Sequence, residues 1–440
     1  MRIMPGVTWH PYDDKVYVHS VDSQRDYIFE GIVLDVLNFF AEHDNATFDE
    51  LCAKLSAEYA IDADELKSDM SEFVDELLAE KILFKGNDPY IEEPWSNKIP
   101  REVAAHFADK HKLFSISFEL TYRCVEKCIH CYIDDAPKFC AADELRLDEY
   151  KDILRQAREL GCVQVLFTGG EVLLRPDLCD IVDEAVRLGL IVNVYTTGVG
   201  LTDKVFDRLC AVKIDGISFS LYSGIAEEHD KITGVRGSFE KTLKAALMFK
   251  SRGVNTFIKC VAMKQNFDSL ESLYELGKRL NLHVTISPRI ISGHDGKCSN
   301  NYSLGSVELY KKFYETSFRY VPADETAGKL SREQMLNKSS CDAGINSLSV
   351  DPFGGVRPCN TFHEAFGSLR SESLQNIWER VWRLNLKNCR MRDVTPNCST
   401  CEYLEYFTVC VADLLNKNHG EFIECGETLL MAKGAAEALK

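Results

Sequence analysis

Three cysteines, Cys124, Cys128 and Cys131, lie close together in the sequence CVEKCIHC, directly after the alternating segment FSISFEL. Three thiolates in one short loop can each bind one iron of a cubane 4Fe–4S cluster, which leaves the fourth iron without a protein ligand. Such an open iron can bind a substrate or a cofactor. The alternative is a zinc site completed by His130 or a distant residue. His130 lies between two of the ligands and is badly placed for the same metal, so the spacing favours the cluster.

The region that begins at residue 113 alternates between strand-like and helix-like segments, and this pattern indicates the fold that positions the cysteines. The candidate strands are FSISFEL, VQVLFTG, IVNVYTT, GISFSLY, FIKCVAM and VTISP. Six strand–helix repeats favour a parallel sheet rolled into a barrel or partial barrel. In such folds the chemistry lies at the carboxyl ends of the strands. The cysteines follow the first strand, so we expect the site at that end of the barrel.

The sequence CVEKCIHCY resembles the cysteine signature of the radical S-adenosylmethionine (radical SAM) enzymes. The resemblance implies that Cys124, Cys128 and Cys131 are the catalytic cysteines and ligate a 4Fe–4S cluster. Its open iron would be chelated by the amino and carboxylate groups of S-adenosylmethionine (SAM). In that family an electron from the reduced cluster cleaves SAM to a 5′-deoxyadenosyl radical, which abstracts hydrogen from the substrate. The implied electron donor is a protein such as flavodoxin or ferredoxin.

A supporting motif follows the second candidate strand, in TGGEVLLRPD. Gly169, Gly170 and Glu171 resemble the Gly-Gly-Glu motif of the family, which receives the amino group of SAM. The residue types suit that role, because glycines allow close backbone approach and a carboxylate pairs with an ammonium group. The family usually has proline after the glutamate, whereas this chain has Val172, a change that removes no hydrogen-bonding group. On its own, Gly-Gly-Glu is more often a turn.

Three other segments resemble SAM contacts of the same family. The third candidate strand ends in YTTGVGL, similar to a Thr-Asn-Gly turn near the SAM ribose, so Thr196 and Gly198 carry over while Thr197 replaces the asparagine. Ser220, in SFSLYSG, resembles a contact to the ribose or carboxylate of SAM. Tyr132 occupies a position that commonly faces the adenine, with an ordinary core aromatic as the alternative.

The cysteines near the end of the chain resemble a second module. The segment CDAGINSLSVDPFGGVRPC is similar to the start of a SPASM domain, the auxiliary iron–sulfur module of peptide-modifying radical SAM enzymes. The resemblance implies one or two auxiliary clusters, with these metal ligands: Cys341, Cys359, Cys398, Cys401, Cys410 and Cys425. The spacing from Cys401 to Cys410 departs from the usual pattern, and one cysteine of the middle pair is absent.

Six cysteines cannot ligate two cubanes through thiolates alone, because that needs eight. Cys298 and Cys389 would complete the number, but neither sits at an obvious motif position. One cluster therefore keeps an open iron or takes a ligand other than cysteine. By sequence order we assign Cys341, Cys359 and Cys410 to one cluster and Cys398, Cys401 and Cys425 to the other. A pair of structural zinc sites is the alternative.

Residues 1–85 form a separate unit in which two clear strand segments, KVYVHSV and DYIFEG, precede three helices. Thr47 and Asp62 are the expected capping residues of the second and third helices. The order of elements resembles the peptide-recognition domain related to the pyrroloquinoline-quinone D protein (PqqD). Such domains, fused to radical SAM enzymes, bind the leader of a ribosomally made precursor peptide. Residues 47–81 contain eleven acidic and three basic side chains, which we interpret as a solvated face.

Composition and charge limit the classes of partner and the cellular compartment that we expect for this protein. A formal charge of −17 disfavours a nucleic-acid partner. No segment approaches the roughly 20 apolar residues of a membrane helix, and the N-terminus lacks a secretory signal. We therefore expect a cytoplasmic protein with no membrane partner. Disulfides are rare in a reducing compartment, so the 17 cysteines favour metal binding where they cluster.

These observations predict an α/β fold with a partial (β/α)6 TIM-like barrel, an N-terminal winged-helix-like peptide-binding domain and a C-terminal cysteine-rich iron–sulfur domain. The expected boundaries are 1–85 for leader recognition, 86–112 for a linker, 113–310 for the radical SAM core and 311–440 for the SPASM domain.

The resemblance implies an oxidoreductase that modifies a precursor peptide, and an open iron on an auxiliary cluster favours a thioether cross-link from cysteine to carbon. Carbon–carbon cross-linking, epimerisation and decarboxylation are open alternatives. So are modification of tetrapyrrole side chains and a non-catalytic, zinc-stabilised peptide-binding protein.

Overall fold

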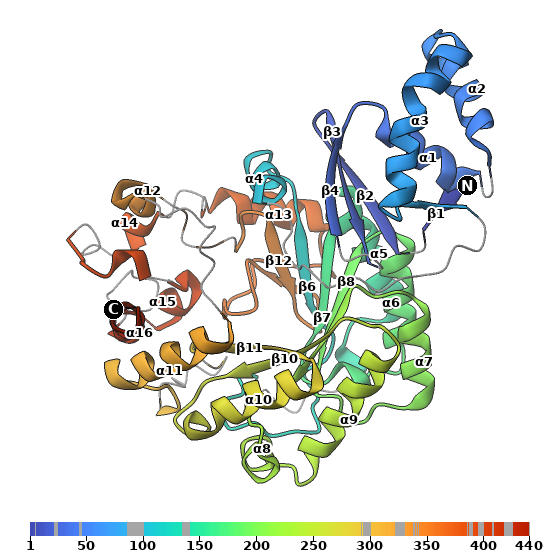
Figure 1. Cartoon of the computed structure of the whole chain (residues 1–440). Coiled ribbons are helices and arrows are strands. Elements are labelled where there is room, and N and C mark those ends of the chain that lie inside the picture. The colour runs from blue at the N-terminus through green and yellow to red at the C-terminus, as the bar shows by residue number, and fades with distance from the viewer. Residues whose placement is uncertain are drawn as a thin grey trace.

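A nine-stranded sheet runs through the centre of the protein in the computed structural model of the chain (Figure 1). The described residues are 1–4, 6–21, 25–43, 46–85, 101–133, 141–291, 293, 301–321, 331–337, 339, 341, 343–384, 386, 390–394, 400–406, 409–417 and 426–439. The strands of the core are β6 (Ser115–Glu119), β7 (Gln164–Thr168), β8 (Ile191–Thr196), β9 (Gly216–Ser220), β10 (Thr256–Val261) and β11 (His283–Ser287). They pair in parallel in chain order, and they coincide with the six strands that the sequence predicts.

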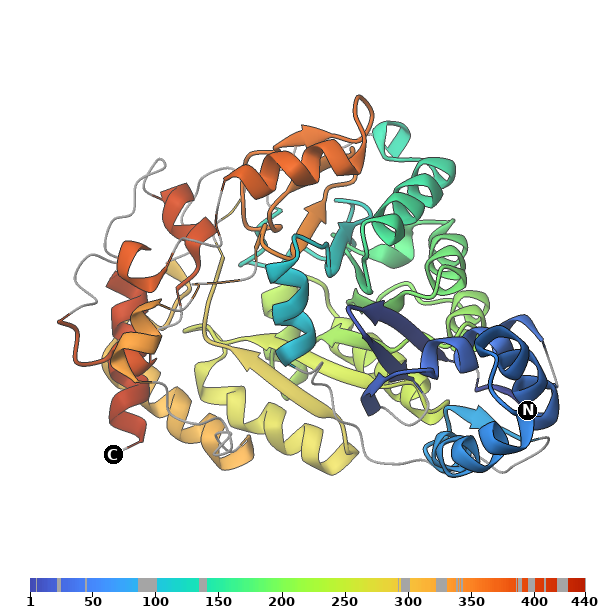
Figure 2. The ribbon, with the colours of Figure 1, turned by 90° about the horizontal axis from the view of Figure 1, so that it is seen from above.

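Helices cover the outer face of these strands because every second strand residue is apolar and points outward. The helices of the core are α5 (Leu147–Glu159), α6 (Leu178–Arg187), α7 (Asp203–Ala211), α8 (Ala226–Thr233), α9 (Ser238–Ser251) and α10 (Leu270–Leu280). In β6, for example, Ile116 and Phe118 are buried in this outer core, whereas Ser115, Ser117 and Glu119 point to the inner face. Figure 2 shows the helices as a ring on one side of the curved sheet.

The sheet stays open, because β11 and β6 do not pair with each other. Instead β12 (Ser347–Val350) adds to β6 in parallel, and β13 (Gly355–Arg357) and β14 (Gly367–Ser368) continue the sheet. The cysteine-rich region thus contributes strands to the same sheet as the core. The expected α/β partial barrel with a C-terminal iron–sulfur domain is confirmed.

The C-terminal region also contains six helices that the structure describes: α11 (Val307–Tyr320), α12 (Arg332–Asn337), α13 (Leu374–Arg383), α14 (Met391–Val394), α15 (Val411–Lys417) and α16 (Gly426–Ala438). Helix α16 packs closely on α11, since a Cβ at Gly434 would lie 2.4 Å from the Cβ of Tyr310. The boundary expected between residues 310 and 311 falls inside α11, so we propose that the division lies before Val307. None of the described helices is both long and apolar enough to cross a membrane.

The N-terminal region contains a three-stranded antiparallel sheet and three helices. Its elements are β1 (Arg2–Ile3), β2 (Val7–Tyr12), β3 (Lys15–Ser20), β4 (Arg25–Glu30), α1 (Val33–Glu42), α2 (Phe48–Tyr59), α3 (Ala63–Ala79) and β5 (Leu83–Phe84). Thr47 forms the expected capping box and Asp62 caps α3. Strand β2 lies outside the two segments named as strands from the sequence, and its Pro11 is tolerated because β2 is an edge strand.

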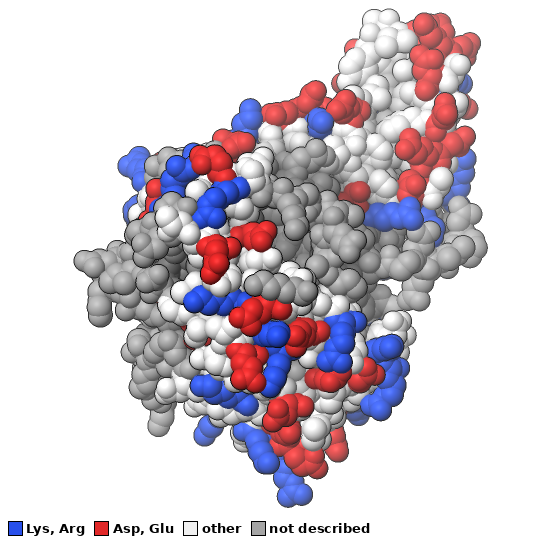
Figure 3. All heavy atoms as spheres, turned by 60° about the vertical axis from the view of Figure 1, so that its left-hand side comes forward, with Lys and Arg blue, Asp and Glu red and all other residues white. Residues whose placement is uncertain are grey.

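The acidic side chains of α2 and α3 lie on the outer surface of this N-terminal region, where red patches mark the upper lobe in Figure 3. Asp49, Glu58, Asp69, Glu72 and Asp75 are all exposed, whereas Leu66, Met70 and other apolar residues of the same helices face the core. The interpretation of this acidic stretch as a solvated face agrees with that placement.

The N-terminal sheet closes the amino-terminal end of the barrel (Figures 1 and 2). Tyr17 of β3 packs with Val163 and Ile191, which stand at the starts of β7 and β8. Helix α4 (Arg101–Asp109) joins this contact through Val103 and Phe107, both buried. The stretch predicted as a linker, 86–112, therefore contains a helix that packs against both domains.

A buried histidine ties the same interface together. The His19 side chain lies between two carboxylates, with Nδ1 2.8 Å from Asp26 and Nε2 2.9 Å from Asp215, the residue before β9. Burial by itself lowers the pKa of His19, but the hydrogen bonds to Asp215 and Asp26 outweigh it and raise the pKa from 6.5 to about 9. The histidine is therefore charged at neutral pH and bridges the N-terminal sheet to the barrel.

This bridge predicts a pH dependence of stability. Because the folded-state pKa is raised, the contact contributes fully below pH 6.5 and is lost as the pH rises through about 9. We expect His19→Gln to cost roughly 3 kcal/mol at pH 6 and little above pH 10. Chemical denaturation of both proteins across that range measures the difference, and parallel stability curves would contradict the bridge.

Candidate functional site

The three predicted cluster ligands lie in the loop after β6, at the carboxyl edge of the sheet. The loop is fixed to the end of α8, since the backbone N–H of Lys127 donates to the carbonyl of Thr233 at 2.8 Å. Within the loop, the N–H of Cys131 donates to the carbonyl of Cys128 at 3.1 Å. Cys124 is exposed, and Cys128 and Cys131 are half-buried. The first strand and α8 therefore present three thiols in one loop, as expected.

The chemistry of this loop suits a metal cluster. Cys124 is exposed as a residue, but packing around its Sγ raises the pKa of the thiol to about 12, and the carboxylates of Glu171 and Glu126 add to the shift. Burial and the carboxylate of Glu126 likewise raise the pKa of Cys128. Thiols with raised pKa values are protonated at neutral pH, so metal binding must release their protons. In the described part of the chain no three His, Cys, Asp or Glu side chains are arranged to hold a single metal ion. Three separate thiols fit the irons of a 4Fe–4S cluster, each of which takes one thiolate.

Gly169 and Gly170 let the end of β7 touch the start of the cysteine loop. The N–H of Gly170 donates to the carbonyl of Thr121 at 2.6 Å, and the next N–H donates to the carbonyl of Arg123 at 2.9 Å. A Cβ at Gly169 would lie 2.4 Å from the Thr121 oxygen, and a Cβ at Gly170 would lie 2.4 Å from the Arg123 oxygen. The glycines are required because two backbones meet here.

This contact predicts that Gly170→Ala disturbs the cysteine loop. A methyl group 2.4 Å from a backbone oxygen must push the segments apart, at a cost of about 1–3 kcal/mol. We expect a lower melting temperature and less bound iron after anaerobic purification. Gly426→Ala is the matched control, because nothing lies within 4 Å of a Cβ there. Equal iron contents in the two variants would show that the contact does not position the loop.

Glu171 is fully buried and connects the ends of β7 and β8. Its carboxylate accepts hydrogen bonds from Leu173 N at 2.9 Å, Thr196 Oγ1 at 2.5 Å, Thr197 N at 2.7 Å and Thr197 Oγ1 at 2.5 Å. These four donors fill the acceptor sites of a carboxylate. Burial raises its pKa, which the hydrogen bonds oppose. To accept a hydrogen bond from the SAM amino group, Glu171 would have to lose one of these donors or accept two hydrogen bonds at one site, and that role stays a prediction.

The turn after β8 is held by Thr196, whose Oγ1 accepts a hydrogen bond from Gly198 N at 2.9 Å. Gly198 has φ +77° and lies against Ala245, so it cannot carry a side chain without strain. Ser220, at the end of β9, hydrogen-bonds the hydroxyl of Tyr222. The structure thus brings the predicted SAM contacts on β7, β8 and β9 to the same edge of the sheet as the cysteine loop.

Tyr222 is a residue that sequence reasoning missed. Its ring packs edge-on against His130 at 4.6 Å between centroids, and its N–H donates to Nδ1 of His229 at 3.1 Å. Burial and the nearby thiol of Cys128 raise its pKa. Its position just beyond the β9 strand, two residues after Ser220, is the signal that could have identified it. Tyr222 fixes the cysteine loop against the end of β9.

Glu119 is a second residue that was missed. It is the last residue of β6 and fully buried, and it accepts hydrogen bonds from Tyr132 at 2.6 Å and Tyr122 at 3.0 Å. Burial raises its pKa to about 7. Tyr132 also accepts a hydrogen bond from Asn360 at 3.5 Å, next to Cys359. Tyr132, predicted to face the adenine, therefore lies between the cysteine loop and the SPASM segment. The sequence signal for Glu119 was available, because it is an acidic residue on the same inward face of β6 as the polar residues Ser115 and Ser117.

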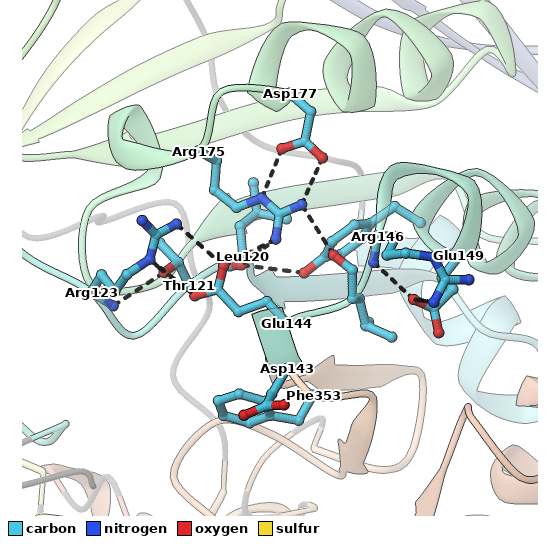
Figure 4. A network of polar contacts seen from close by, with 12 residues as sticks. Leu120, Thr121, Arg123, Asp143, Glu144, Arg146, Glu149, Arg175, Asp177 and Phe353 are labelled. Atoms are coloured by element: carbon cyan, nitrogen blue, oxygen red, sulfur yellow. Dashed lines mark hydrogen bonds and ion pairs between the residues drawn. The ribbon is translucent and has the colours of Figure 1, made fainter. Parts of the chain in front are cut away.

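A buried ionic network supports the entrance to the cysteine loop (Figure 4). Glu144 accepts from Thr121 Oγ1 at 2.5 Å, from Arg123 at 3.3 Å and from Arg175 at 3.3 Å. Arg175 also donates to Asp177 at 2.7 Å and to the carbonyls of Leu120 and Leu145. Both Arg175 and Glu144 have almost no exposed side-chain surface. The network fixes the backbone that leads from β6 to Cys124.

The structure brings together three of the predicted auxiliary ligands. Cys341, Cys359 and Cys410 all pack against a small apolar cluster of Ala343, Phe362 and Ala412. These three cysteines are the set that we assigned to one cluster by sequence order, and the assignment stays a proposal. Cys401 lies outside this apolar cluster and accepts a hydrogen bond from Arg332 through its carbonyl. The remaining candidates lie outside the described residues: Cys298, Cys389, Cys398 and Cys425.

Comparison with known families agrees with this arrangement. Residues 118–277 match the radical SAM superfamily, and residues 341–402 match the SPASM iron–sulfur cluster-binding domain. The chain is a radical SAM enzyme. Residues 31–83 of this radical SAM enzyme match coenzyme PQQ synthesis protein D (PqqD). The family, the enzymatic nature and the three kinds of domain predicted from the sequence are confirmed. Its cofactors are a 4Fe–4S cluster and SAM, with auxiliary iron–sulfur clusters in the SPASM domain.

Several characterised proteins are similar to this radical SAM enzyme. The AdoMet-dependent heme synthase of Methanosarcina barkeri is 26% identical over 324 residues, covering 68% of this chain and 90% of that protein. PqqA peptide cyclase of Ruegeria pomeroyi is 28% identical over 304 residues, covering 64% and 78%. The structure of Streptococcus suis SuiB bound to precursor peptide SuiA has a TM-score of 0.62 and 15% identity, covering 97% of this chain and 100% of that chain. At 15% identity, the similarity to SuiB shows that the two proteins share a fold and no more.

Proposed function

We propose that this radical SAM enzyme modifies a ribosomally synthesised precursor peptide. The observation that carries the proposal is the union, in one chain, of a PqqD-like domain, a radical SAM core and a SPASM domain. A similar protein is named PqqA peptide cyclase, and a structure with the same fold was solved with its precursor peptide. A peptide substrate accounts for the presence of the PqqD-like domain, which contributes no residue to the candidate catalytic site.

Leader binding would use the edge of β4 that pairs with no other strand among the described residues. This strand pairs with β3 on one side and ends the three-stranded sheet on the other. Helix α3 lies beside it, with Phe73 packed edge-on against Phe29 at 5.9 Å and Glu80 hydrogen-bonded to Tyr27 at 2.8 Å. An exposed strand edge next to a helix suits strand addition by an extended peptide, whose alternate side chains enter the groove.

At the barrel mouth, Cys124, Cys128 and Cys131 would hold the 4Fe–4S cluster. When bound, the cluster and SAM supply a 5′-deoxyadenosyl radical that abstracts hydrogen from substrate. The absence of side chains at Gly169 and Gly170 lets the end of β7 lie directly against the backbone at the start of the cysteine loop, which would position that loop for the cluster. Contacts to SAM are proposed for these residues: Tyr132, Gly169, Gly170, Glu171, Thr196, Gly198 and Ser220.

The modification that we propose is a thioether cross-link from a substrate cysteine to carbon. The SPASM region has six motif cysteines where two fully ligated cubanes need eight, so one auxiliary cluster would keep an iron free for the substrate thiolate. The surplus electron of the oxidative closure would pass to an auxiliary cluster. Flavodoxin or ferredoxin would supply the reducing electron, in the cytoplasm.

A second candidate is tetrapyrrole chemistry, favoured by the similarity to a heme synthase over 324 residues. The PqqD-like domain argues against it, because residues 31–83 would then have no assigned ligand. A tetrapyrrole that co-purified with the protein would reverse this ranking.

Anaerobic co-expression with the precursor peptide encoded beside the gene tests the proposal. We expect the peptide to lose two hydrogens and to lose one thiol that iodoacetamide can alkylate. Loss of two hydrogens with all thiols free would indicate a carbon–carbon bond, an unchanged mass would indicate epimerisation, and loss of carbon dioxide would indicate decarboxylation. A peptide left unmodified under conditions in which the enzyme cleaves SAM would contradict the proposal, and co-expression with Cys128→Ala gives the inactive control.

A further inference from the structure

Lys259, which forms no ion pair with a carboxylate among the described residues, lies on the inner face of the partial barrel. Lys259 is in β10, and its neighbours in register are Ser220 on β9 and Thr285 on β11. Ile258 and Cys260, on either side of it, are buried in the outer core beneath the helices. The strand alternation therefore directs Lys259 into the lumen, below the edge that carries the cysteine loop.

The inner face of the sheet around Lys259 is polar and reached by solvent. On β11 the inward residues His283, Thr285 and Ser287 are exposed, while Val284 and Ile286 are buried against α10. Tyr195, an inward residue of β8, is 37% exposed although helices cover the other face of its strand. A polar inner surface that solvent reaches, between strands packed tightly on their outer side, is the usual form of a substrate cavity.

No carboxylate in the part of the chain that the structure describes balances the charge of Lys259. Among the described residues no carboxylate forms an ion pair with it, and burial lowers its pKa with no acidic neighbour to oppose the shift. All inward positions on the six core strands are described, and Glu119 is the one acidic residue among them. Its carboxylate already accepts hydrogen bonds from the hydroxyls of Tyr122 and Tyr132. A partly buried ammonium without a partner is stabilised when a ligand supplies an anion.

The direction of the Lys259 side chain indicates which ligand would supply the anion. The Lys259 ammonium lies 5.9 Å from the ring centre of Tyr195 and 6.0 Å from that of Phe257. Both rings belong to the row of the sheet nearer the amino ends of the strands, since Tyr195 pairs with Ser218 and Ser218 with Phe257. The ammonium thus leans into the lumen, away from the edge where SAM is proposed to bind.

We propose that Lys259 binds a carboxylate of the substrate inside the lumen and thereby sets a preference for an acidic residue beside the site of modification. The proposal rests on the assignment of the barrel as the reaction chamber, and it holds for any substrate that carries a carboxylate there. It extends the proposed function by specifying a carboxylate on the substrate near the atom that reacts.

Binding of two small probes to the SAM-loaded holoenzyme tests this. The probes are N-acetylglutamate methylamide and its neutral counterpart, N-acetylglutamine methylamide, measured by ligand-observed NMR under anaerobic conditions. We expect the parent to prefer the glutamate probe, and Lys259→Met to weaken its binding by about tenfold without changing binding of the neutral probe. Lys259→Arg should keep most of the preference. Lys244→Met, an exposed lysine on the outer helix α9, is the matched control.

The outcomes separate the sources of the carboxylate. Unchanged SAM affinity together with loss of the glutamate preference supports the proposal and shows that the variant is folded. Equal glutamate binding in Lys259→Met and the parent would overturn it. So would weakened SAM binding with the glutamate preference intact, because Lys259 would then serve the carboxylate of SAM. Failure of the peptide co-expression experiment would leave the probe result standing, so the two proposals fail separately.

Discussion

Replacing Cys128 by alanine is expected to abolish the formation of 5′-deoxyadenosine. The thiol is half-buried in the loop after β6, close to Cys124 and Cys131, and no other described cysteine lies in that loop to take its place. Loss of one of three ligands should remove about four irons per chain and lower SAM cleavage by more than ~100-fold. Iron and sulfide analysis and chromatography of the nucleoside products measure both effects.

The matched control for this experiment is Cys210→Ala, at a half-buried thiol on α7 away from the cysteine loop. It should retain the iron and the activity of the parent. The auxiliary cysteines give a further contrast, because Cys359→Ala should remove iron from the SPASM domain while SAM cleavage in the absence of peptide continues. Cleavage of SAM by Cys128→Ala at the rate of the parent would rule out this loop as the cluster site.

The core of the fold was predictable because its signals are local. Outward apolar residues recur at every second position of the core strands, as Ile116 and Phe118 do in β6, and amphipathic helices separate the strands. The cysteine loop could be predicted from the spacing of its three cysteines alone. Those patterns occur within a few residues, so no knowledge of distant contacts was necessary.

The parts that could not be predicted depend on partners far away in the sequence. Among the side chains of helix α4 that the structure describes, Val103 and Phe107 are deeply buried, and their partner Tyr17 comes from the N-terminal sheet. Glu119 accepts a hydrogen bond from Tyr132, which in turn accepts one from Asn360, a residue 228 positions away from Tyr132 in the sequence. Strand β2 contains Pro11, which its edge position makes acceptable, and that position is set by pairing with β3. In each case the tertiary contact decides the structure, and the local sequence carries little of that information.

The network in Figure 4 makes Arg175 the position where a single substitution should destabilise the radical SAM core most. Its guanidinium lies almost fully buried between Glu144 and Asp177 and donates to the carbonyls of Leu120 and Leu145. Arg175→Met keeps the length of the side chain but leaves Glu144 with one charged partner fewer in a buried site. Breaking a buried ion pair in this way costs about 3–5 kcal/mol.

We therefore expect Arg175→Met to lower the free energy of unfolding by that amount and to lose iron, because the backbone leading to Cys124 is no longer fixed. The double variant Arg175→Met/Glu144→Gln should recover part of the loss, since the remaining buried carboxylate is then neutral. Arg187→Met is the matched control, because its ion pair with Glu184 is at the surface and contributes at most about 1 kcal/mol. Denaturation of these variants and of Glu144→Gln alone, with iron content measured in each, tests the coupling. If the double variant lost stability as the sum of its single substitutions, Glu144 and Arg175 would act independently, and the network would not be the element that positions the cysteine loop.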